Sequence, residues 1–328
     1  MLNIFKSLNS NNQIIVKNFS YLTLMKVFNI GVKVILAAYL IRILGSEKYG
    51  LITWLDSVIQ YFIMIVNFGF NIYAAKYIVE NKNKKTKINE IVSSIFIIKG
   101  VLFMLSLIFV FLLGSFETFS AYKTFLLLLM FSGIGEVLFP VWFFQGIENL
   151  KPATFIVFLT RLFLLIGTVI FVNSQYNLMA YILLFVSSSI LMGFSGIFYL
   201  FKYNNIKIII LPINKLVNYF KEALPFFIGR FLSLVFNSGT IFFIGKFCLL
   251  EQVAGFDTGL KIVMLGVIPF EMLQQAVFPT ISRTKNKSML KKIVYAALII
   301  GVLVGLITYL FSNNLMFLFG GDEMLKYS

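Results

Sequence analysis

Long, uninterrupted apolar stretches are the feature of this chain that most restricts its fold. Nine of them reach the ~20 residues that a helix needs to cross the hydrocarbon core of a bilayer. They cover residues 18–44, 51–75, 91–114, 122–143, 153–172, 178–201, 223–245, 253–279 and 292–311. Charged residues make up only 12% of the 328 positions, against about 25% in soluble domains. The sequence therefore predicts an all-α, polytopic membrane protein with nine transmembrane helices.

The residue content also limits the chemistry. The chain has no histidine and a single cysteine, Cys248, which excludes an internal disulfide, a multi-cysteine metal site and Ser-His or Cys-His catalysis within this sequence. The loops predicted on the outer side are too short for the catalytic acids or arginines of a membrane-embedded glycosyltransferase or polymerase. We therefore expect no enzyme activity and no cofactor.

Basic residues gather on alternate loops. Most of them fall on the side of the N-terminus, including the run at 82–87. The opposite side carries only Lys48, Lys123, Lys246 and Lys326. This asymmetry predicts a cytoplasmic N-terminus. It also accounts for the net charge of +15, so we expect no nucleic-acid partner.

Two lysines interrupt the first apolar stretch. Lys26 and Lys33 are seven residues apart, which places them on one face of a helix. An ammonium inside the bilayer costs ~2.5–3.5 kcal/mol on insertion scales, so it needs water, a partner or an anionic ligand. Lys33 is the more central of the two, while Lys26 is near enough to the cytoplasmic end to snorkel. The pair indicates a polar cavity along this helix.

Three other predicted helices carry polar stripes. Taking ~100° per residue, the stripe of the second helix spans roughly 60°. The stripes consist of Thr53, Asp56, Gln60, Asn67 and Asn71; of Arg230, Ser233, Asn237 and Thr240; and of Asp257, Lys261, Glu271 and Gln275. These sets predict that helices one, two, seven and eight line one cavity. The alternative is that the polar groups join helices to one another, and Asp257 and Lys261 simply neutralise each other.

Four carboxylates lie within predicted spans. Asp56, Glu136, Asp257 and Glu271 are candidates for coupling to a proton or sodium gradient. For Glu136 a structural ion pair with Arg161 of the next helix is the competing interpretation.

An internal repeat divides the chain. Lys26 precedes Glu47, and Arg230 precedes Glu251, by the same 21 residues, so the two segments share an offset of 204. Duplication is common in transporters, which bind substrate between the repeats. We expect an N-terminal six-helix bundle at 1–205, a cytoplasmic linker at 206–222 and a partial second bundle at 223–328.

Two motifs resemble those of one bacterial family. The segment Pro140-Val-Trp142-Phe-Phe-Gln145-Gly146-Ile-Glu148 is similar to the Pro-x-Trp-x-x-Gln-Gly-x-Glu signature of Wzx-type O-antigen and polysaccharide repeat-unit flippases. Leu44-Gly45-Ser-Glu47-Lys-Tyr49-Gly50 resembles the Leu-Gly-x-Glu-x-Tyr-Gly segment of the same family. From the residues themselves, Pro140 bends or ends a helix, Trp142 suits the headgroup layer and Gly146 permits a tight turn. The first motif therefore indicates a structural or gating turn.

The resemblance implies a MATE-like fold of the multidrug, oligosaccharidyl-lipid and polysaccharide exporter superfamily, with two helical bundles around a central cavity. It implies that the chain flips an oligosaccharide joined through diphosphate to undecaprenol, in contact with membrane lipid and with a polysaccharide polymerase and chain-length regulator. The expected substrate ligands are Lys26, Lys33, Arg230, Lys261, Asp56, Gln60, Asn67 and Asn237.

Two alternatives share this fold. They are a peptidoglycan lipid-precursor flippase and a cation-coupled multidrug exporter; the lysines of the first helix argue against the exporter. The family has about twelve helices, so with nine predicted spans we expect a chain truncated at its C-terminus.

Overall fold

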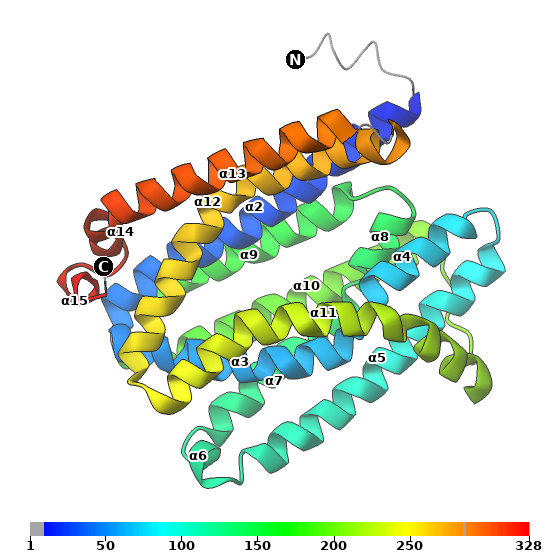
Figure 1. The fold of residues 1–328 in the computed structure, drawn as a ribbon. Helices are drawn as coiled ribbons and strands as arrows, with labels where there is room; N and C mark the ends of the chain where they lie inside the picture. Colours follow the sequence, from blue (N-terminus) through cyan, green and yellow to red (C-terminus); the bar gives the residue numbers. More distant parts are fainter. Residues whose placement is uncertain (1–9, 285–286, 328) are drawn as a thin grey trace.

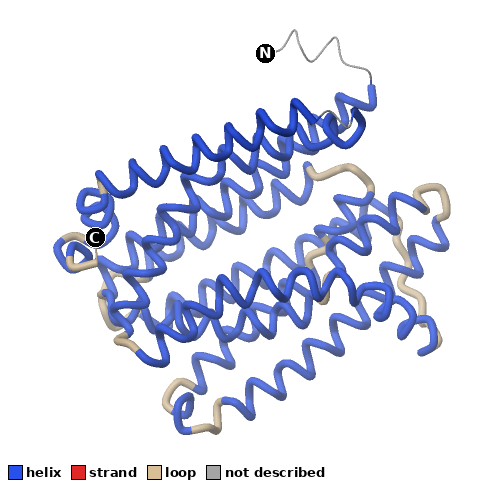
Figure 2. Tube along the Cα trace, viewed as in Figure 1, coloured by secondary structure: helices blue, strands red, loops and turns tan. Residues whose placement is uncertain are grey.

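The computed structural model describes residues 10–284 and 287–327, and every element in these ranges is a helix (Figures 1 and 2). This confirms the all-α class. The helices are α2 (Ser10–Leu44), α3 (Ser46–Asn67), α4 (Phe70–Glu80), α5 (Lys85–Leu113), α6 (Glu117–Ser120), α7 (Lys123–Leu138), α8 (Val141–Gly146), α9 (Lys151–Phe171), α10 (Leu178–Asn204), α11 (Ile213–Phe247), α12 (Leu250–Thr284), α13 (Lys287–Leu310), α14 (Ser312–Gly320) and α15 (Asp322–Leu325).

Six segments among the described residues are long and apolar enough to cross a membrane. They are Asn18–Leu44, Ser46–Glu80, Lys85–Leu113, Lys123–Gly146, Lys151–Phe171 and Leu178–Asn204. The number rises to seven if Leu298–Leu310 and Ser312–Gly320, bent by 69°, form one broken span. The three remaining predicted spans coincide with α11, α12 and α13. The chain is therefore a polytopic membrane protein whose predicted spans all fall on helices.

The long helices run back and forth between two ends of the molecule (Figure 1). The turns around Gly45, 114–122, 172–177 and 248–249 lie at one end, called here the Gly45 end. The turns at 81–84, 147–150 and 205–212 lie at the other, called the Asn205 end, where Lys82 pairs with Glu148 at 2.8 Å and Lys215 with Glu90 at 3.2 Å. The basic loop residues that the sequence groups together thus meet at one end of the bundle.

Two of the spans are broken inside the bundle. Between α3 and α4, Phe68 and Gly69 both adopt left-handed backbone conformations, with φ of 38° and 71°. Between α7 and α8, Pro140 caps the new helix, as its lack of an N–H and fixed φ predict. The chain then turns after Gly146 and enters α9, which has Pro152 in its first turn.

Helix α3 is the centre of the packing. It contacts α5, α7, α11 and α12, and it buries Leu55, Val58 and Ile59 against neighbours from both halves of the chain. Helix α11 runs along α3 and α4, where Phe68 stacks between Phe220 and Phe227. Helix α12 crosses to α2, so both repeats contribute to one continuous bundle.

The segment predicted as a linker joins α10 to α11. It is free of helix from Asn205 to Pro212, and α11 begins at Ile213. Two side chains of α5 bind this segment. Asn89 accepts a hydrogen bond from the backbone N–H of Lys207, and Ser93 accepts one from the backbone N–H of Ile209. The linker is therefore tied to the first half of the chain.

Candidate functional site

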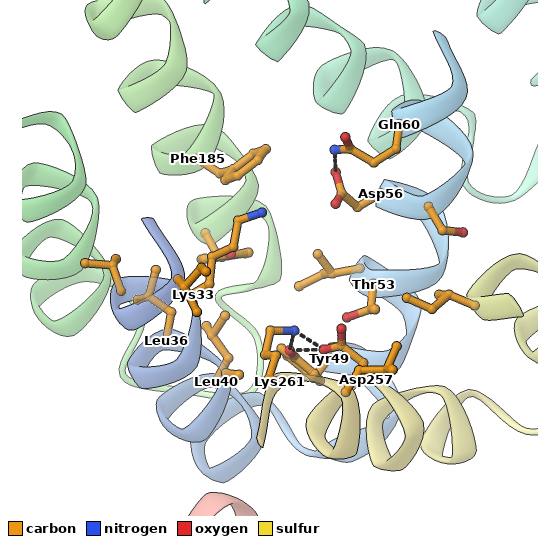
Figure 3. A pocket seen from close by; sticks show the side chains of 18 of the residues that line it. Lys33, Leu36, Leu40, Tyr49, Thr53, Asp56, Gln60, Phe185, Asp257 and Lys261 are labelled. Carbon is orange, nitrogen blue, oxygen red and sulfur yellow. Dashed lines mark hydrogen bonds and ion pairs between the residues drawn. The ribbon is translucent and has the colours of Figure 1, made fainter. Parts of the chain in front are cut away.

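A polar cavity of about 350 Å³ lies among the helices, in the half of the molecule nearer the Gly45 end. Helices α2, α3, α11 and α12 line it, with α11 contributing Ser238 and Ile241, and α7, α9 and α10 complete the wall. Its polar lining consists of Lys33, Tyr49, Thr53, Asp56, Ser57, Gln60, Arg161, Tyr181, Ser238, Asp257 and Lys261. Figure 3 shows side chains from α2, α3 and α12 converging on this space.

Lys33 enters the cavity from α2. Its helix packs through Leu36, Ala37 and Leu40, which are 1–3% exposed, and this fixes the direction of the neighbouring lysine. Within the described part of the chain, no group forms a hydrogen bond or ion pair with its ammonium. Asp56 of α3 is the charged side chain that interacts with it most strongly, and Figure 3 shows both reaching into the same space.

Asp56 and Gln60 form a hydrogen-bonded pair on the opposite wall. Gln60 Nε2 donates to Asp56 Oδ1 at 3.1 Å, one helical turn away. Both residues line the cavity, and the bond uses one of the two carboxylate oxygens of Asp56. Such oxygens accept hydrogen bonds from hydroxyl groups, so this wall suits a polyhydroxylated ligand.

Tyr49, Asp257 and Lys261 form a cluster between α3 and α12. Tyr49 Oη donates to the Asp257 carboxylate and accepts from Lys261 Nζ at 2.8 Å. Lys261 also forms an ion pair with Asp257, one turn earlier on the same helix. Lys261 therefore lines the cavity with its charge already neutralised.

Arg161 reaches the cavity from α9. Its Nε donates to Oδ1 of Asn29 on α2 at 2.7 Å. The ion pair expected between Arg161 and Glu136 is absent from the described contacts, because Glu136 instead accepts from Asn67 Nδ2 at 3.1 Å. With Lys33 and Lys261 against Asp56 and Asp257, Arg161 gives the lining one formal positive charge in excess.

The structure brings five predicted site residues to the cavity: Lys33, Lys261, Asp56, Gln60 and Asp257. Lys26 and Arg230 do not line it. Lys26 lies seven residues before Lys33, and Arg230 eight before the lining residue Ser238, so each is ~10–12 Å nearer the Asn205 end at 1.5 Å per residue. The side chains of Asn237 and Glu271 lie outside the described residues.

Asn67 and Glu136 also lie away from the cavity. Asn67 lies seven residues after Gln60 on α3, which places it ~10 Å nearer the Asn205 end than that lining residue; the break at Phe68 and Gly69 comes after it. Asn67 turns to α7 and bonds Glu136, whose backbone oxygen accepts from Lys99 at 2.6 Å. Lys99 is 1% exposed, so this cluster joins α3, α5 and α7 inside the first half.

The motif at 140–148 is a packed turn. Trp142 is completely buried within the protein, where it packs against Phe96 and Phe143. Its expected depth in the headgroup layer stays a prediction. A Cβ at Gly146 would come within 2.7 Å of Ile78 Cβ, which explains the glycine. Glu148 pairs with Lys82, and its backbone oxygen accepts from Asn18. No contact among the described residues connects the motif with the cavity lining.

Seven polar lining residues are not among the substrate ligands predicted from the sequence: Tyr49, Thr53, Ser57, Arg161, Tyr181, Ser238 and Asp257. Arg161 was detectable as an isolated cation inside an apolar stretch. Tyr49 belongs to the second motif, at residues 44–50, whereas Tyr181 carried no signal, since tyrosine is common in membrane helices near interfaces.

The helix boundaries support the internal repeat. Helices α2 and α11 each contain 35 residues, and α3 and α12 begin at Ser46 and Leu250, which is the 204-residue offset. Each second helix has a glutamate in its first turn, Glu47 or Glu251. Glu251 bonds Lys326 at the Gly45 end, and this hydrogen bond lowers the pKa of its carboxyl below the ordinary value.

Comparison with known proteins gives one family. The sequence profile described as "Polysaccharide biosynthesis protein" matches residues 15–285. A protein of Escherichia coli (strain K12) named "Putative O-antigen transporter" is 23% identical over 318 residues, which are 94% of this chain and 76% of that relative. A protein of Shigella dysenteriae with the same name is 25% identical over 296 residues, 85% of this chain and 71% of its own. No solved structure matches the chain significantly.

Proposed function

The chain belongs to the polysaccharide biosynthesis protein family, and from this premise we propose that it flips lipid-linked oligosaccharide repeat units across the bacterial cytoplasmic membrane. The substrate is an oligosaccharide joined through diphosphate to undecaprenol, and it moves from the inner to the outer leaflet for O-antigen, capsule or exopolysaccharide assembly. The relatives' name, O-antigen transporter, supports this role. Transport of this kind makes and breaks no covalent bond, so it needs no catalytic group.

The observation that carries the proposal is the unpartnered Lys33 in a polar cavity between the repeats. An ammonium in a membrane-spanning helix without a bonded partner among the described residues is costly, and a phosphate oxygen supplies the partner it lacks. The other walls can bind sugar hydroxyls, because they carry acceptor oxygens on Asp56 and Gln60 and a hydroxyl on Tyr181. A cavity with excess positive charge disfavours the cationic drugs that a multidrug exporter must accept.

The two halves, 1–205 and 223–328, then move relative to each other in alternating access, with the N-terminus cytoplasmic. The prenyl tail stays in the lipid, and the head group passes through the cavity. A polysaccharide polymerase and a chain-length regulator act on the delivered units.

The test is surface display in a bacterium that lacks its own repeat-unit flippase. The full chain, Lys33→Gln and Lys26→Gln are expressed, and surface polysaccharide is measured beside the amount of protein in the membrane. We expect Lys33→Gln to lower display about tenfold or more, because it removes a charge-assisted hydrogen bond. Lys26→Gln should lower it less, because Lys26 does not line the cavity.

Normal display with Lys33→Gln at wild-type membrane levels would overturn the cationic-cavity mechanism. Equal losses in the two variants would restore the sequence hypothesis that both lysines contact the substrate. Lysis of the native host on depletion, with surface polysaccharide retained, would point to a peptidoglycan precursor instead.

A further inference from the structure

Arg161 is held in a geometry that suits a second anionic group. Asn29 accepts from its Nε at 2.7 Å, which uses one N–H of the guanidinium. The terminal nitrogens have no described carboxylate within ion-pair distance. A guanidinium presents its donors as a planar fork that matches phosphate, so an arginine fixed through Nε keeps its binding edge available.

Asn29 and Lys33 lie four residues apart on α2, hence on the same face of that helix. Asn29, which accepts the hydrogen bond from Arg161, therefore lies one helical turn from Lys33. Arg161 and Lys33 also line the same cavity and carry the same charge. Two like charges in one low-dielectric cavity repel each other unless an anion lies between them.

We infer that Lys33 and Arg161 bind the two phosphates of one diphosphate, and that Arg161, positioned by Asn29, makes the cavity select a diphosphate over a monophosphate. This inference rests on the proposed function and adds its specificity. A single phosphate satisfies one cation and leaves the other unneutralised. A diphosphate contacts both cations. It therefore also relieves the repulsion between Lys33 and Arg161, which adds to the preference for diphosphate over monophosphate.

The competing role for Arg161 is structural, since its bond to Asn29 also ties α9 to α2. A purely structural arginine would lower the stability of the protein when replaced. It would change the affinities for both lipids alike. The ratio of the two affinities therefore separates the roles, while thermal unfolding reports on the structural one.

The experiment measures binding of undecaprenyl diphosphate and undecaprenyl monophosphate to the purified full chain in lipid nanodiscs. The variants are Arg161→Gln, Arg161→Lys and Asn29→Ala. Arg42→Gln is the matched control, because Arg42 is an arginine of α2 that donates to the backbone oxygen of Leu318 and does not line the cavity. Thermal unfolding of every variant is recorded alongside.

We expect the wild type to prefer the diphosphate and Arg161→Gln to lower that preference about tenfold, the effect of one charge-assisted contact. Arg161→Lys keeps the charge but loses the fork, so it should fall between them. Asn29→Ala should shift the ratio in the same direction by a smaller factor, and Arg42→Gln should leave it unchanged. If Arg161→Gln fails to fold, the ratio of diphosphate to monophosphate affinity in Arg161→Lys and Asn29→Ala tests the inference.

An unchanged ratio in the Arg161 and Asn29 variants, with wild-type preference for diphosphate, would overturn this inference alone. A wild type that binds the diphosphate and the monophosphate equally would also overturn this inference alone. A wild type that binds neither lipid would remove the proposed function as well.

Discussion

Gly50 shows how much a single residue matters where the two repeats meet. A Cβ at this position would lie 1.8 Å from the carbonyl oxygen of Leu250, so the backbones of α3 and α12 approach as closely as they do only because the side chain is absent. We expect Gly50→Ala to lower the free energy of unfolding by about 1–3 kcal/mol, as overpacking does elsewhere.

Gly31→Ala is the matched control for this prediction. Gly31 is also a helix glycine, but nothing lies within 4 Å of the position that a Cβ would take there, so alanine should be neutral or stabilise α2 by up to about 1 kcal/mol. Denaturation of both purified variants compares the two sites. Equal stabilities would mean that α3 and α12 tolerate a wider separation than the structure shows.

At the residue scale, helical periodicity predicts which face of a helix a residue occupies, but not its position along the length of the bundle. Lys33, Asp56 and Gln60 were found because α2 and α3 are regular through these positions. Asn67 shares the α3 face of Asp56 and Gln60 but lies ~10 Å further along the helix than Gln60, and only Asn71 lies beyond the left-handed Phe68. Lys26 and Arg230 have the residue types expected of the site, but the height of the cavity along the helices is a tertiary property that no local pattern contains.

At the scale of elements, the contact between α4 and α11 holds the halves together near the Asn205 end. Phe68 stacks between two phenylalanines, and Tyr73 Oη donates to Glu222 Oε2 at 2.6 Å. Gly69 faces the backbone of Phe226 and Phe227 just beyond Pro225 of α11, so the break in one helix meets the proline of the other. The length of the apolar stretches predicted the second and the seventh spans. It did not predict the break between α3 and α4, since Phe68 and Gly69 lie within a continuous apolar stretch.

A double-mutant cycle on Tyr73→Phe and Glu222→Gln tests this contact. We expect a coupling free energy of about 1 kcal/mol, because the bond joins a hydroxyl to a partly exposed carboxylate. The cycle is measured by denaturation of the purified protein. Tyr77→Phe with Glu222→Gln is the control pair, since Tyr77 bonds Tyr219, and its coupling should be near zero. Comparable coupling in both cycles would mean that the hydrogen bond of Tyr73 is not specific to Glu222.

At the scale of the whole molecule, the ends of the bundle differ in charge, and this predicts the orientation in the membrane. Cys248 is exposed and lies at the Gly45 end, so a membrane-impermeant maleimide should label it in intact spheroplasts. Cys248→Ser combined with Lys84→Cys moves the single thiol to the Asn205 end. That variant should be labelled only after the membrane is permeabilised, and the reverse pattern would invert the proposed topology.

The cluster of Tyr49, Asp257 and Lys261 has a consequence for the speed of alternating access. Asp257 and Lys261 are one turn apart on α12, so their ion pair travels with that helix when α12 leaves α3. Only the bonds of the neutral Tyr49 hydroxyl break. Separating a buried ion pair would strand two charges at a cost of several kcal/mol each. In the proposed alternating access, this cluster would therefore separate by breaking two hydrogen bonds to a phenol, and no charge would be left alone.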